Sequence, residues 1–336
     1  MKQKPSIVIA GATGLVGNEL VVLIDELKLA HSDIKLLASE DSVGEFYKVA
    51  DDRVAVEKLR EEALSGADLV FLALPPGLAA RYAAVAREAG AVVIDTSSQF
   101  RLDPSVPLIV AEINASTLTP NDHLIANPSG TVLALCSVLN VVRRAAPLKR
   151  AVISTYQACA GAGKVALDEL YEQTLAVFNQ KDVPHEAFQH QIAFNTIPQI
   201  DLVQESGNTR EELRLVEETR RILDMPKLGI TATAVRIPVF HGDALSLNLE
   251  LGAALPPAAL IEMLSAQPGI QVYAEPDQFP MPIDVVNTDE IHVGRIRQDS
   301  SVPYGLNLWI VVDSLRRGTA LNALRIAQHL IGIPRA

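Results

Sequence analysis

Ile7-Val8-Ile9-Ala10-Gly11-Ala12-Thr13-Gly14-Leu15-Val16-Gly17 is the stretch that decides the fold of the first part of the chain. Its four leading apolar residues predict a short buried strand that ends at the first glycine. Apolar residues at helical spacing then predict a helix from Asn18 to Leu29. A strand, a glycine-rich turn and a helix in this order form the first half of a βαβ unit.

The glycines of this turn also indicate a nucleotide site. Their G-x-x-G-x-x-G spacing permits a tight turn and lets backbone N–H groups and the positive end of the helix dipole approach a phosphate. A tight turn that binds no ligand is the alternative interpretation. The residues expected to form the site are Gly11, Thr13, Gly14, Leu15, Val16 and Gly17.

The same alternation of short strands and helices continues through the first third of the chain. Strands are predicted at 34–38, 69–74 and 92–94, with a helix over 78–89. This order predicts right-handed crossovers and an α/β fold with a doubly wound parallel sheet.

The middle of the chain has a different pattern, which suits a mixed or antiparallel sheet with helices on one face. A final helix is expected over 319–331. The expected helices of the middle part are 131–144, 164–178 and 210–223, and its expected strands are 151–154, 232–238 and 245–251.

The composition indicates a folded protein of about two domains. Its 336 residues are 49% hydrophobic and 21% charged, which excludes a disordered or low-complexity chain. The net charge of −11 disfavours binding to nucleic acids and anionic membranes, and no apolar run approaches the roughly 18 residues of a membrane-spanning helix. Two cysteines form no disulfide framework, and no Cys/His spacing predicts a metal site. We expect a soluble, cytoplasmic protein.

The end of the second predicted strand bears on the choice of dinucleotide. Ser39, Glu40 and Asp41 follow that strand, and Glu40 lies about 20 residues beyond the glycine loop. A carboxylate at this place accepts hydrogen bonds from a ribose 2′-hydroxyl and repels a 2′-phosphate. Either NAD or NADP could bind, and the two acids favour NAD; two solvated surface acids are the alternative.

Several segments together resemble the aspartate-β-semialdehyde dehydrogenase family, in the family's order and over nearly the whole chain. They are 11–17, Ile94-Asp95-Thr96-Ser97-Ser98-Gln99-Phe100-Arg101, Asn127-Pro128-Ser129-Gly130-Thr131, Ser154-Thr155-Tyr156-Gln157, Arg236-Ile237-Pro238-Val239, Val293-Gly294-Arg295-Ile296-Arg297 and Asp313-Ser314-Leu315-Arg316.

The resemblance implies a Rossmann-like dinucleotide domain, 1–128 with a C-terminal helix at about 317–336, and an α+β substrate and dimerisation domain, 129–316. It implies a homodimer and a place in amino-acid biosynthesis. The family reaction is a reversible NADP-dependent reductive dephosphorylation of β-aspartyl phosphate. A cysteine thiolate forms a thioacyl intermediate, hydride from the nicotinamide reduces it, and a histidine serves as acid and base.

At the reacting groups, this sequence departs from the family. The nucleophilic cysteine of the family falls at Gly130, which has no side chain. The family histidine falls seven residues after Arg236, at Asp243, and an aspartate is a poor acid at neutral pH. The family's adenylate-phosphate arginine is absent near Asp41, and Ser314 replaces an asparagine on the nicotinamide side.

The positions that hold the substrate in the family are matched more closely in this sequence than the positions of the reacting groups. Arg101 matches a phosphate-binding arginine, and Gln157 matches a residue that orients the acyl group. Glu211 matches the amine-binding glutamate, Arg214 replaces a phosphate-binding lysine, and Arg236 matches the carboxylate-binding arginine. An ordinary surface pair of Glu211 and Arg214 is the alternative for those two.

Three residues are candidates to substitute for the missing thiol and imidazole. Cys136 is expected to be a small core residue, because six helical residues turn it away from Gly130. Cys159 lies nearer the expected chemistry, but a nucleophile there needs a different acyl position. If 236–247 is one strand, His241 and Asp243 share a face and could act as an acid–base pair; a loop histidine is the favoured alternative.

These observations predict a family member that does not catalyse the family reaction but keeps the fold, the dimer and a site for a dinucleotide or small anionic ligand. One alternative is an active NAD(P)-dependent oxidoreductase with changed chemistry, acting on a small anion without a covalent intermediate. Another is an interaction partner of an active paralogue, since a mixed dimer needs the interface and not the active site.

Overall fold

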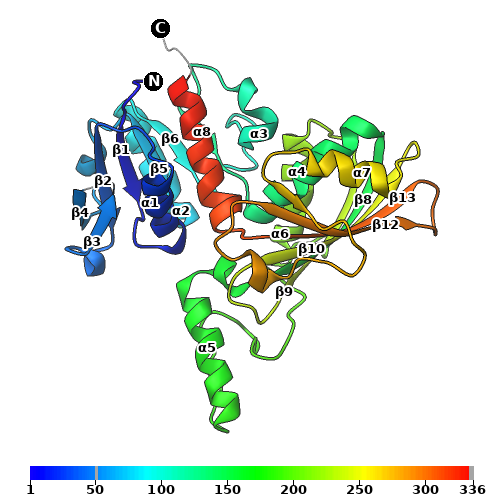
Figure 1. Ribbon diagram of the computed structural model, residues 1–336. Helices are drawn as coiled ribbons and strands as arrows, with labels where there is room; N and C mark the ends of the chain where they lie inside the picture. The colour runs from blue at the N-terminus through cyan, green and yellow to red at the C-terminus, as the bar shows by residue number, and fades with distance from the viewer. Residues whose placement is uncertain (50–51, 333–336) are drawn as a thin grey trace. The chain divides into compact units, whose positions relative to one another are not determined.

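The computed structural model describes residues 1–49 and 52–332, which form two compact units (Figure 1). The first unit is Met1–Ser129 with Thr319–Ala336, and the second is Gly130–Gly318. The expected C-terminal helix is seen as α8 (Leu321–Gly332), and residues 333–336 of that expectation lie outside the described part. Within the described residues, no helix is long and apolar enough to cross a membrane.

The first unit is built on a seven-stranded sheet with the order β3-β4-β2-β1-β5-β6-β7. All neighbouring strands are parallel except β3 and β4, which pair in antiparallel fashion. This confirms the predicted doubly wound parallel sheet. The strands are β1 (Ser6–Ala10), β2 (Asp33–Ala38), β3 (Phe46–Val49), β4 (Asp52–Lys58), β5 (Leu69–Leu72), β6 (Val92–Asp95) and β7 (Leu124–Ala126).

Helices cover this sheet because each has one apolar face. α1 (Leu15–Glu26) and α8 bury that face together against β1, β2 and β5, in one hydrophobic cluster. α2 (Pro76–Glu88) packs on β5 and β6, and the short α3 (Ala111–Asn114) contacts α8. α1 begins at Leu15, within the glycine motif 11–17, so the sheet and helix place the glycine loop at the carboxyl end of β1.

The second unit is built on a six-stranded mixed sheet with the order β11-β12-β13-β10-β8-β9. β8 and β9 are parallel, as are β11 and β12, and the other pairs are antiparallel. This confirms the expected mixed sheet. The strands are β8 (Leu148–Gln157), β9 (Gly229–Arg236), β10 (Asp243–Leu251), β11 (Ile270–Val272), β12 (Ile291–Asp299) and β13 (Gly305–Val312).

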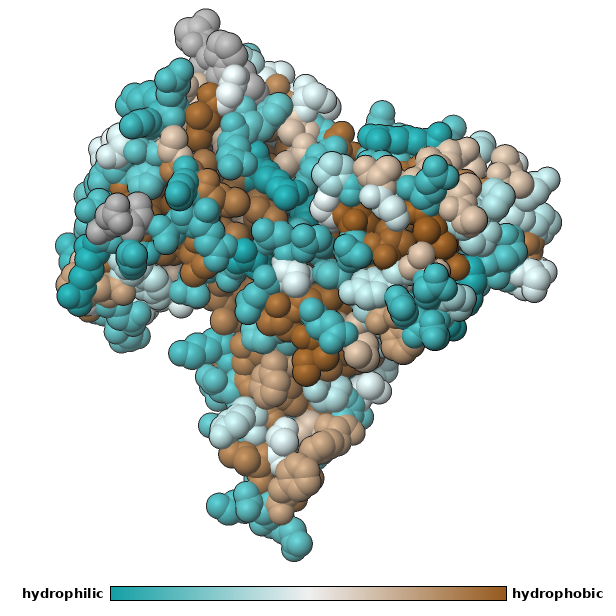
Figure 2. All heavy atoms as spheres, in the orientation of Figure 1, coloured by the Kyte–Doolittle hydropathy of each residue, from teal (hydrophilic) through white to brown (hydrophobic). Residues whose placement is uncertain are grey.

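Three helices pack on this sheet, namely α4 (Gly130–Ala145), α6 (Arg210–Ile222) and α7 (Pro257–Ser265). α5 (Lys164–Phe178) has the bounds predicted for it and projects away from the sheet (Figure 1). Its projecting part carries exposed apolar side chains, among them Tyr171, Leu175 and Phe178, and Figure 2 shows tan and brown spheres there.

The single strand over 236–247 that a His241–Asp243 pair requires does not form. β9 ends at Arg236 and β10 begins at Asp243, with a loop between them. Gly242 turns this loop at a φ of +88°, where a Cβ atom would lie 2.4 Å from the carbonyl oxygen of Pro282. His241 therefore belongs to the loop, which confirms the favoured interpretation of a loop histidine, and the strand argument for a His241–Asp243 pair fails.

Candidate functional site

The glycine loop of the first unit has the backbone geometry of a phosphate-binding turn. Gly11 has a φ of +88°, and a Cβ atom there would lie 2.2 Å from the carbonyl oxygen of Ala73. A Cβ atom at Gly17 would lie 2.0 Å from the carbonyl oxygen of Gly11, so helix α1 approaches the loop more closely than any side chain permits. Gly14 precedes α1 in extended conformation and offers no side-chain cap. The geometry fits a dinucleotide whose phosphates meet the first N–H groups of α1, from Leu15 and Val16 onward.

The segment after β2 lies beside this loop. Ser42 Oγ donates a hydrogen bond to Thr13 Oγ1 over 3.2 Å, which joins the segment to the glycine loop. Ser39 precedes a short 3₁₀ turn that begins at Glu40. The Glu40 carboxylate forms an ion pair with Lys58 of β4, which holds the pKa of Glu40 below its usual range. Glu40 is therefore charged at neutral pH, but part of its charge is offset by Lys58.

Arg101 is buried within the first unit, with an exposed fraction of 8%. Its Nε donates to the carbonyl oxygen of Asn127 over 2.9 Å, and its Nη2 donates to the carbonyl oxygen of Thr96 over 2.8 Å. These bonds fix the guanidinium between the segments that follow β6 and β7. Its expected role in binding a phosphate stays a prediction.

Gly130 begins α4 in the second unit, and its surroundings leave no room for a side chain. A Cβ atom there would lie 2.3 Å from the carbonyl oxygen, 2.6 Å from the Cα atom and 2.7 Å from the Cβ atom of Ser314. A Cβ atom at Gly318 would in turn lie 2.2 Å from the Cα atom of Gly130. The turn from 314 to 318 therefore fills the space that a nucleophilic side chain at position 130 needs.

Asp313 holds this turn in place, a role that the sequence reasoning missed. Its Oδ1 accepts hydrogen bonds from the backbone N–H groups of Leu315 (3.1 Å) and Arg316 (2.9 Å). Its Oδ2 accepts one from the N–H of Asn287 over 2.9 Å. An aspartate just before a turn is the sequence signal for such an anchor, because its carboxylate can accept hydrogen bonds from the backbone N–H groups that follow.

Asp243, at the expected histidine position, is 3% exposed and surrounded by donors. Its Oδ2 accepts a hydrogen bond from Thr131 Oγ1 over 3.0 Å, and its Oδ1 accepts one from the N–H of Ala158 over 2.8 Å. The Ser314 side chain hydrogen-bonds to it as well. Burial raises the pKa of Asp243 although these donors and the Arg236 guanidinium favour the charged form. The carboxyl group joins three segments of the unit.

Arg236 ends β9 and is 5% exposed. Strand register places it directly beside Gln157 at the end of the parallel strand β8. Its Nη1 donates to the carbonyl oxygen of Ala158 over 2.5 Å. Burial lowers the pKa of Arg236, while the charges of Asp243 and Glu211 act against that change. An arginine so placed stays cationic and offers a guanidinium for a carboxylate.

Gln157, Glu211 and Arg214 lie in the same unit and meet through Glu211. Gln157 Nε2 donates to Glu211 Oε1 over 3.2 Å, and Arg214 Nη1 lies 3.9 Å from Glu211 Oε2. Arg214 Nη1 also lies 2.8 Å from Asp201 Oδ2, which the sequence reasoning missed. Glu211 is buried, so the interpretation of an exposed surface pair is wrong for it. Arg214 already has two carboxylate partners, which weakens its attraction for a phosphate.

The two cysteines and the loop histidine do not replace the missing groups. Cys136 is fully buried in α4, as expected of a core residue, and burial raises the pKa of its thiol. Cys159 is buried too, its Sγ lies 3.6 Å from the carbonyl oxygen of Ile237, and burial raises its pKa to about 11. Such a thiol is protonated at neutral pH and a weak nucleophile. His241 is half-buried in the loop before Asp243.

The second unit thus contains a buried guanidinium at Arg236 and a buried carboxylate at Glu211, and their expected roles in binding a carboxylate and an amine stay predictions. Neither a thiol nor an imidazole stands at the positions where the resemblance places them. Among the described residues, no group of three or more His, Cys, Asp or Glu side chains is arranged to hold a metal ion.

Comparison with known proteins places the chain in a family. Residues 6–120 match the family model "Semialdehyde dehydrogenase, NAD binding domain", and residues 139–317 match "Semialdehyde dehydrogenase, dimerisation domain". The aspartate-semialdehyde dehydrogenase of Prochlorococcus marinus is 37% identical over 328 residues, which cover 97% of this chain and 96% of that protein.

Solved structures agree with this match. The crystal structure of aspartate semialdehyde dehydrogenase II from Vibrio cholerae superposes with a TM-score of 0.95 at 36% identity, covering 98% of this chain and 99% of that one. The probable aspartate-semialdehyde dehydrogenase from Pseudomonas aeruginosa has a TM-score of 0.90 at 30% identity, covering 98% of each chain. The chain therefore belongs to the aspartate-semialdehyde dehydrogenase family.

Proposed function

We propose that this chain does not catalyse the thioacyl chemistry of its family and acts instead as a dimeric protein that binds a dinucleotide and a small carboxylate. The packing at Gly130 carries this proposal. Glycine supplies no nucleophilic atom at this position. A Cβ atom there would lie 2.3 Å from the Ser314 carbonyl oxygen, so the fold leaves no space for a nucleophilic side chain either. Loss of the nucleophile alone removes the acyl-enzyme route on which the family reaction depends.

The second support comes from Asp243. Both of its oxygens already accept hydrogen bonds, from Thr131 and from the Ala158 N–H, and the carboxyl group is buried. A general acid or base must reach the reacting group over about 2.6–3.2 Å. The Asp243 oxygens face Thr131 Oγ1 and the Ala158 N–H instead, so we assign Asp243 the structural role of holding these two segments together. This also argues against the alternative of an active oxidoreductase that uses Asp243 as its base.

For the cofactor we propose a dinucleotide at the glycine loop, with NAD preferred over NADP. The family model for the NAD-binding domain and the turn at Gly11 support dinucleotide binding. The charge of Glu40 supports the preference, because it repels a 2′-phosphate at the end of β2. Bound NAD would supply a hydride acceptor, while this chain's own residues contribute the N–H groups of the loop and the Glu40 carboxylate.

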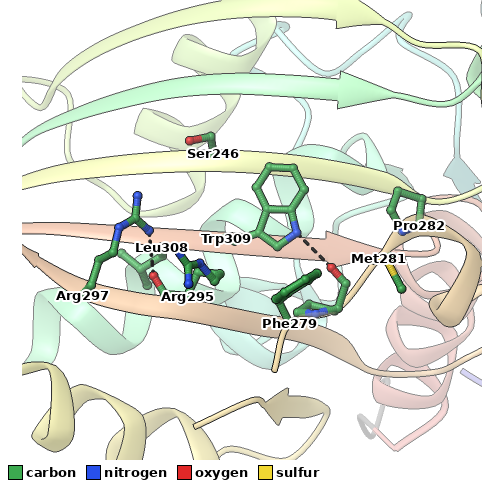
Figure 3. A pocket seen from close by; sticks show the side chains of 9 residues that line it. Ser246, Phe279, Met281, Pro282, Arg295, Arg297, Leu308 and Trp309 are labelled. Carbon is green, nitrogen blue, oxygen red and sulfur yellow. Dashed lines mark hydrogen bonds between the residues drawn. The ribbon is translucent and has the colours of Figure 1, made fainter. Parts of the chain in front are cut away.

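We also propose a homodimer formed through the face of the six-stranded sheet that α4 and α7 leave open. Ser246 lies on this face between Ser154 and Trp309 of the neighbouring strands. Figure 3 shows a cavity beside them, of about 360 Å³, where Trp309 Nε1 donates to the carbonyl oxygen of Pro280 over 3.0 Å. Its wall also contains phenylalanine, methionine and arginine, the residue types enriched at protein interfaces.

The proposal is tested by assaying the purified protein in both directions of the family reaction. Aspartate semialdehyde, phosphate and NAD or NADP are supplied in one direction, and β-aspartyl phosphate with NADH or NADPH in the other. We expect no change in nicotinamide absorbance with enzyme at micromolar concentration. Turnover that Cys159→Ala or Asp243→Asn abolishes would overturn the proposal. A calorimetric titration with NAD and NADP tests the dinucleotide site separately.

A further inference from the structure

The cavity beside Trp309, called the Trp309 cavity below, has the size of a small-molecule site (Figure 3). Its volume of about 360 Å³ lies within the range of ligand pockets. At about 30 Å³ for each water molecule, it holds roughly twelve water-sized groups. Every residue of its wall belongs to the second unit.

A β-bulge in β12 brings a cation to the face of the sheet on which this cavity lies. Gly294 pairs with Trp309 and Arg297 pairs with Asn307, so two residues of β12 stand opposite one residue of β13. Residues that pair directly across antiparallel strands share a face, and Trp309 and Asn307 share one because they are two apart. Arg297 therefore lies on the face of Trp309, where a regular strand would place Ile296.

A second arginine stands within the bulge. Arg295 has a φ of +54°, a conformation that residues other than glycine rarely adopt. Its Nη1 donates to the carbonyl oxygen of Pro276 over 2.7 Å, and Arg297 Nη1 donates to the carbonyl oxygen of Arg295 over 2.9 Å. Nε and Nη2 of both arginines have no hydrogen-bond partner among the described residues, so they can donate to an anionic ligand.

The segment 279–282 forms another wall of the cavity, and two contacts hold it against the sheet. Trp309 Nε1 donates to the carbonyl oxygen of Pro280 over 3.0 Å. A Cβ atom at Gly294 would lie 2.9 Å from Cδ of Pro280, so the glycine lets this segment rest directly on β12. The wall is therefore built before a ligand arrives, which lowers the entropic cost of binding.

The wall separates charge from apolar surface. Figure 3 shows the two arginines at one end of the cavity and Met281 and Pro282 at the other, with Trp309 between them. The polar side chains of the wall are the two arginines and Ser246, and the other members, Phe279 among them, are apolar or aromatic. None of the described residues that line the cavity is acidic. Such a wall matches an anion at one end and a flat apolar group beside the indole ring.

The acid that interacts with Arg297 has other partners as well. Asp299 accepts hydrogen bonds from the Ser301 N–H over 2.9 Å and from Asn248 Nδ2 over 2.6 Å. The Ser301 hydrogen bonds chiefly, and the charge of Arg297 to a smaller extent, lower the pKa of Asp299. The two arginines outnumber this acid, so the bulge end of the cavity attracts a single anionic group.

From this geometry we propose that the Trp309 cavity binds a small aromatic carboxylate, with its carboxylate at Arg295 and Arg297 and its ring beside Trp309. The assignment goes beyond the proposed function, because it involves neither the glycine loop nor the carboxylate expected at Arg236. The cavity lies on the sheet face that we assign to the homodimer, but one chain supplies its whole wall, so binding does not require a second copy.

Fluorescence of Trp309 reports binding in this cavity, because the chain contains one tryptophan. The probe is 3-phenylpropionate, and 3-phenylpropanamide is its uncharged counterpart with the same number of non-hydrogen atoms. We expect the acid to change the fluorescence saturably and to bind about tenfold more tightly than the amide, because hydrogen bonds to charged groups are roughly twice as strong. Added salt should weaken binding of the acid and leave that of the amide unchanged. No saturable change, or equal affinities of acid and amide, would overturn the assignment.

A third probe tests the aromatic ring. 3-Cyclohexylpropionate keeps the carboxylate and the number of non-hydrogen atoms but has no π face. We expect it to bind at least about threefold more weakly than 3-phenylpropionate, since aromatic pairs are stabilised beyond the area that they bury. Equal or tighter binding of the cyclohexyl acid would overturn the assignment of an aromatic ligand.

Variants locate the two ends of the ligand. Arg297→Gln should weaken the acid about tenfold and leave the amide unchanged. Arg144→Gln removes the same charge from the exposed last turn of α4 and should leave both probes unchanged. Met281→Gln, at the apolar end, should weaken acid and amide by a similar factor. Unchanged binding of the acid by Arg297→Gln would overturn the proposal. Dinucleotide titration and turnover are read separately and bear on the proposed function alone.

Discussion

Substitution of Gly130 by alanine tests the packing that underlies the proposed function. The added Cβ atom would lie 2.3 Å from the carbonyl oxygen and 2.6 Å from the Cα atom of Ser314, distances that real Cβ contacts essentially never show. Backbone atoms are the obstacle, and Asp313 anchors the turn through three backbone N–H groups. The turn cannot move aside without losing some of these hydrogen bonds.

The magnitude follows from the cost of overpacking, which is about 1–3 kcal/mol. Against this cost, replacing glycine by alanine at a helical position stabilises the helix by at most about 1 kcal/mol. A net loss of about 1–2 kcal/mol corresponds to a melting temperature lower by roughly 2–8 °C in a domain of 150–250 residues. Gly130→Cys adds a larger side chain and should be destabilised at least as much, without gaining family activity.

Thermal unfolding followed by tryptophan fluorescence gives the measurement, because the single tryptophan, Trp309, lies on β13 of the same unit. Gly77→Ala is the matched control, since its Cβ atom would meet no atom within 4 Å in the first turn of α2. We expect this control to be neutral or slightly stabilised. A Gly130→Ala protein as stable as the wild type would refute the claim that position 130 has no room for a side chain.

Three further predictions use other parts of the chain. Burial raises the native pKa of Asp243, so its protonated carboxyl group stabilises the folded state fully below the unfolded pKa of about 3.9, and this stabilisation is lost as pH rises through the folded pKa. The unfolding free energy of the wild type minus that of Asp243→Asn, both from urea titrations, should therefore fall as pH rises. A difference that rises with pH would contradict the predicted sign. Glu40→Gln should narrow the preference for NAD over NADP in calorimetry, and an unchanged ratio would remove Glu40 from cofactor selection. Ser246→Arg should yield monomers by light scattering, whereas Ser265→Arg on α7 should not; a dimer in both would place the interface elsewhere.

Local patterns predicted the elements whose apolar periodicity is strong. The strand, glycine loop and helix at 7–29 and the helix Lys164–Phe178 were found from spacing alone. β12 and β13 were not identified as strands. Glycine and arginine interrupt the alternation of β12, whereas β13 is apolar except for Asn307 and was overlooked. Their place in the sheet comes from pairing with strands distant in sequence.

The sequence also predicted only part of the candidate site. The sequence pointed to Gly130 and Asp243 as replacements of reacting groups, and the resemblance was needed to do so. It could not show that Ser314 fills the space beside Gly130 or that Thr131 and Ala158 donate to Asp243, because these contacts join residues far apart in the chain. The favoured interpretation of His241 as a loop histidine is confirmed, because Gly242 turns the chain at a φ of +88° before β10 begins.

Intact-protein mass spectrometry after incubation with β-aspartyl phosphate is the most direct measurement of the central claim. Quenching in acid preserves a thioacyl group, and omission of the dinucleotide lets such an intermediate accumulate. We predict an unchanged mass for the wild type and for Cys159→Ala. An added aspartyl group on the wild type would contradict the account, and its loss in Cys159→Ala would identify the thiol that carries it.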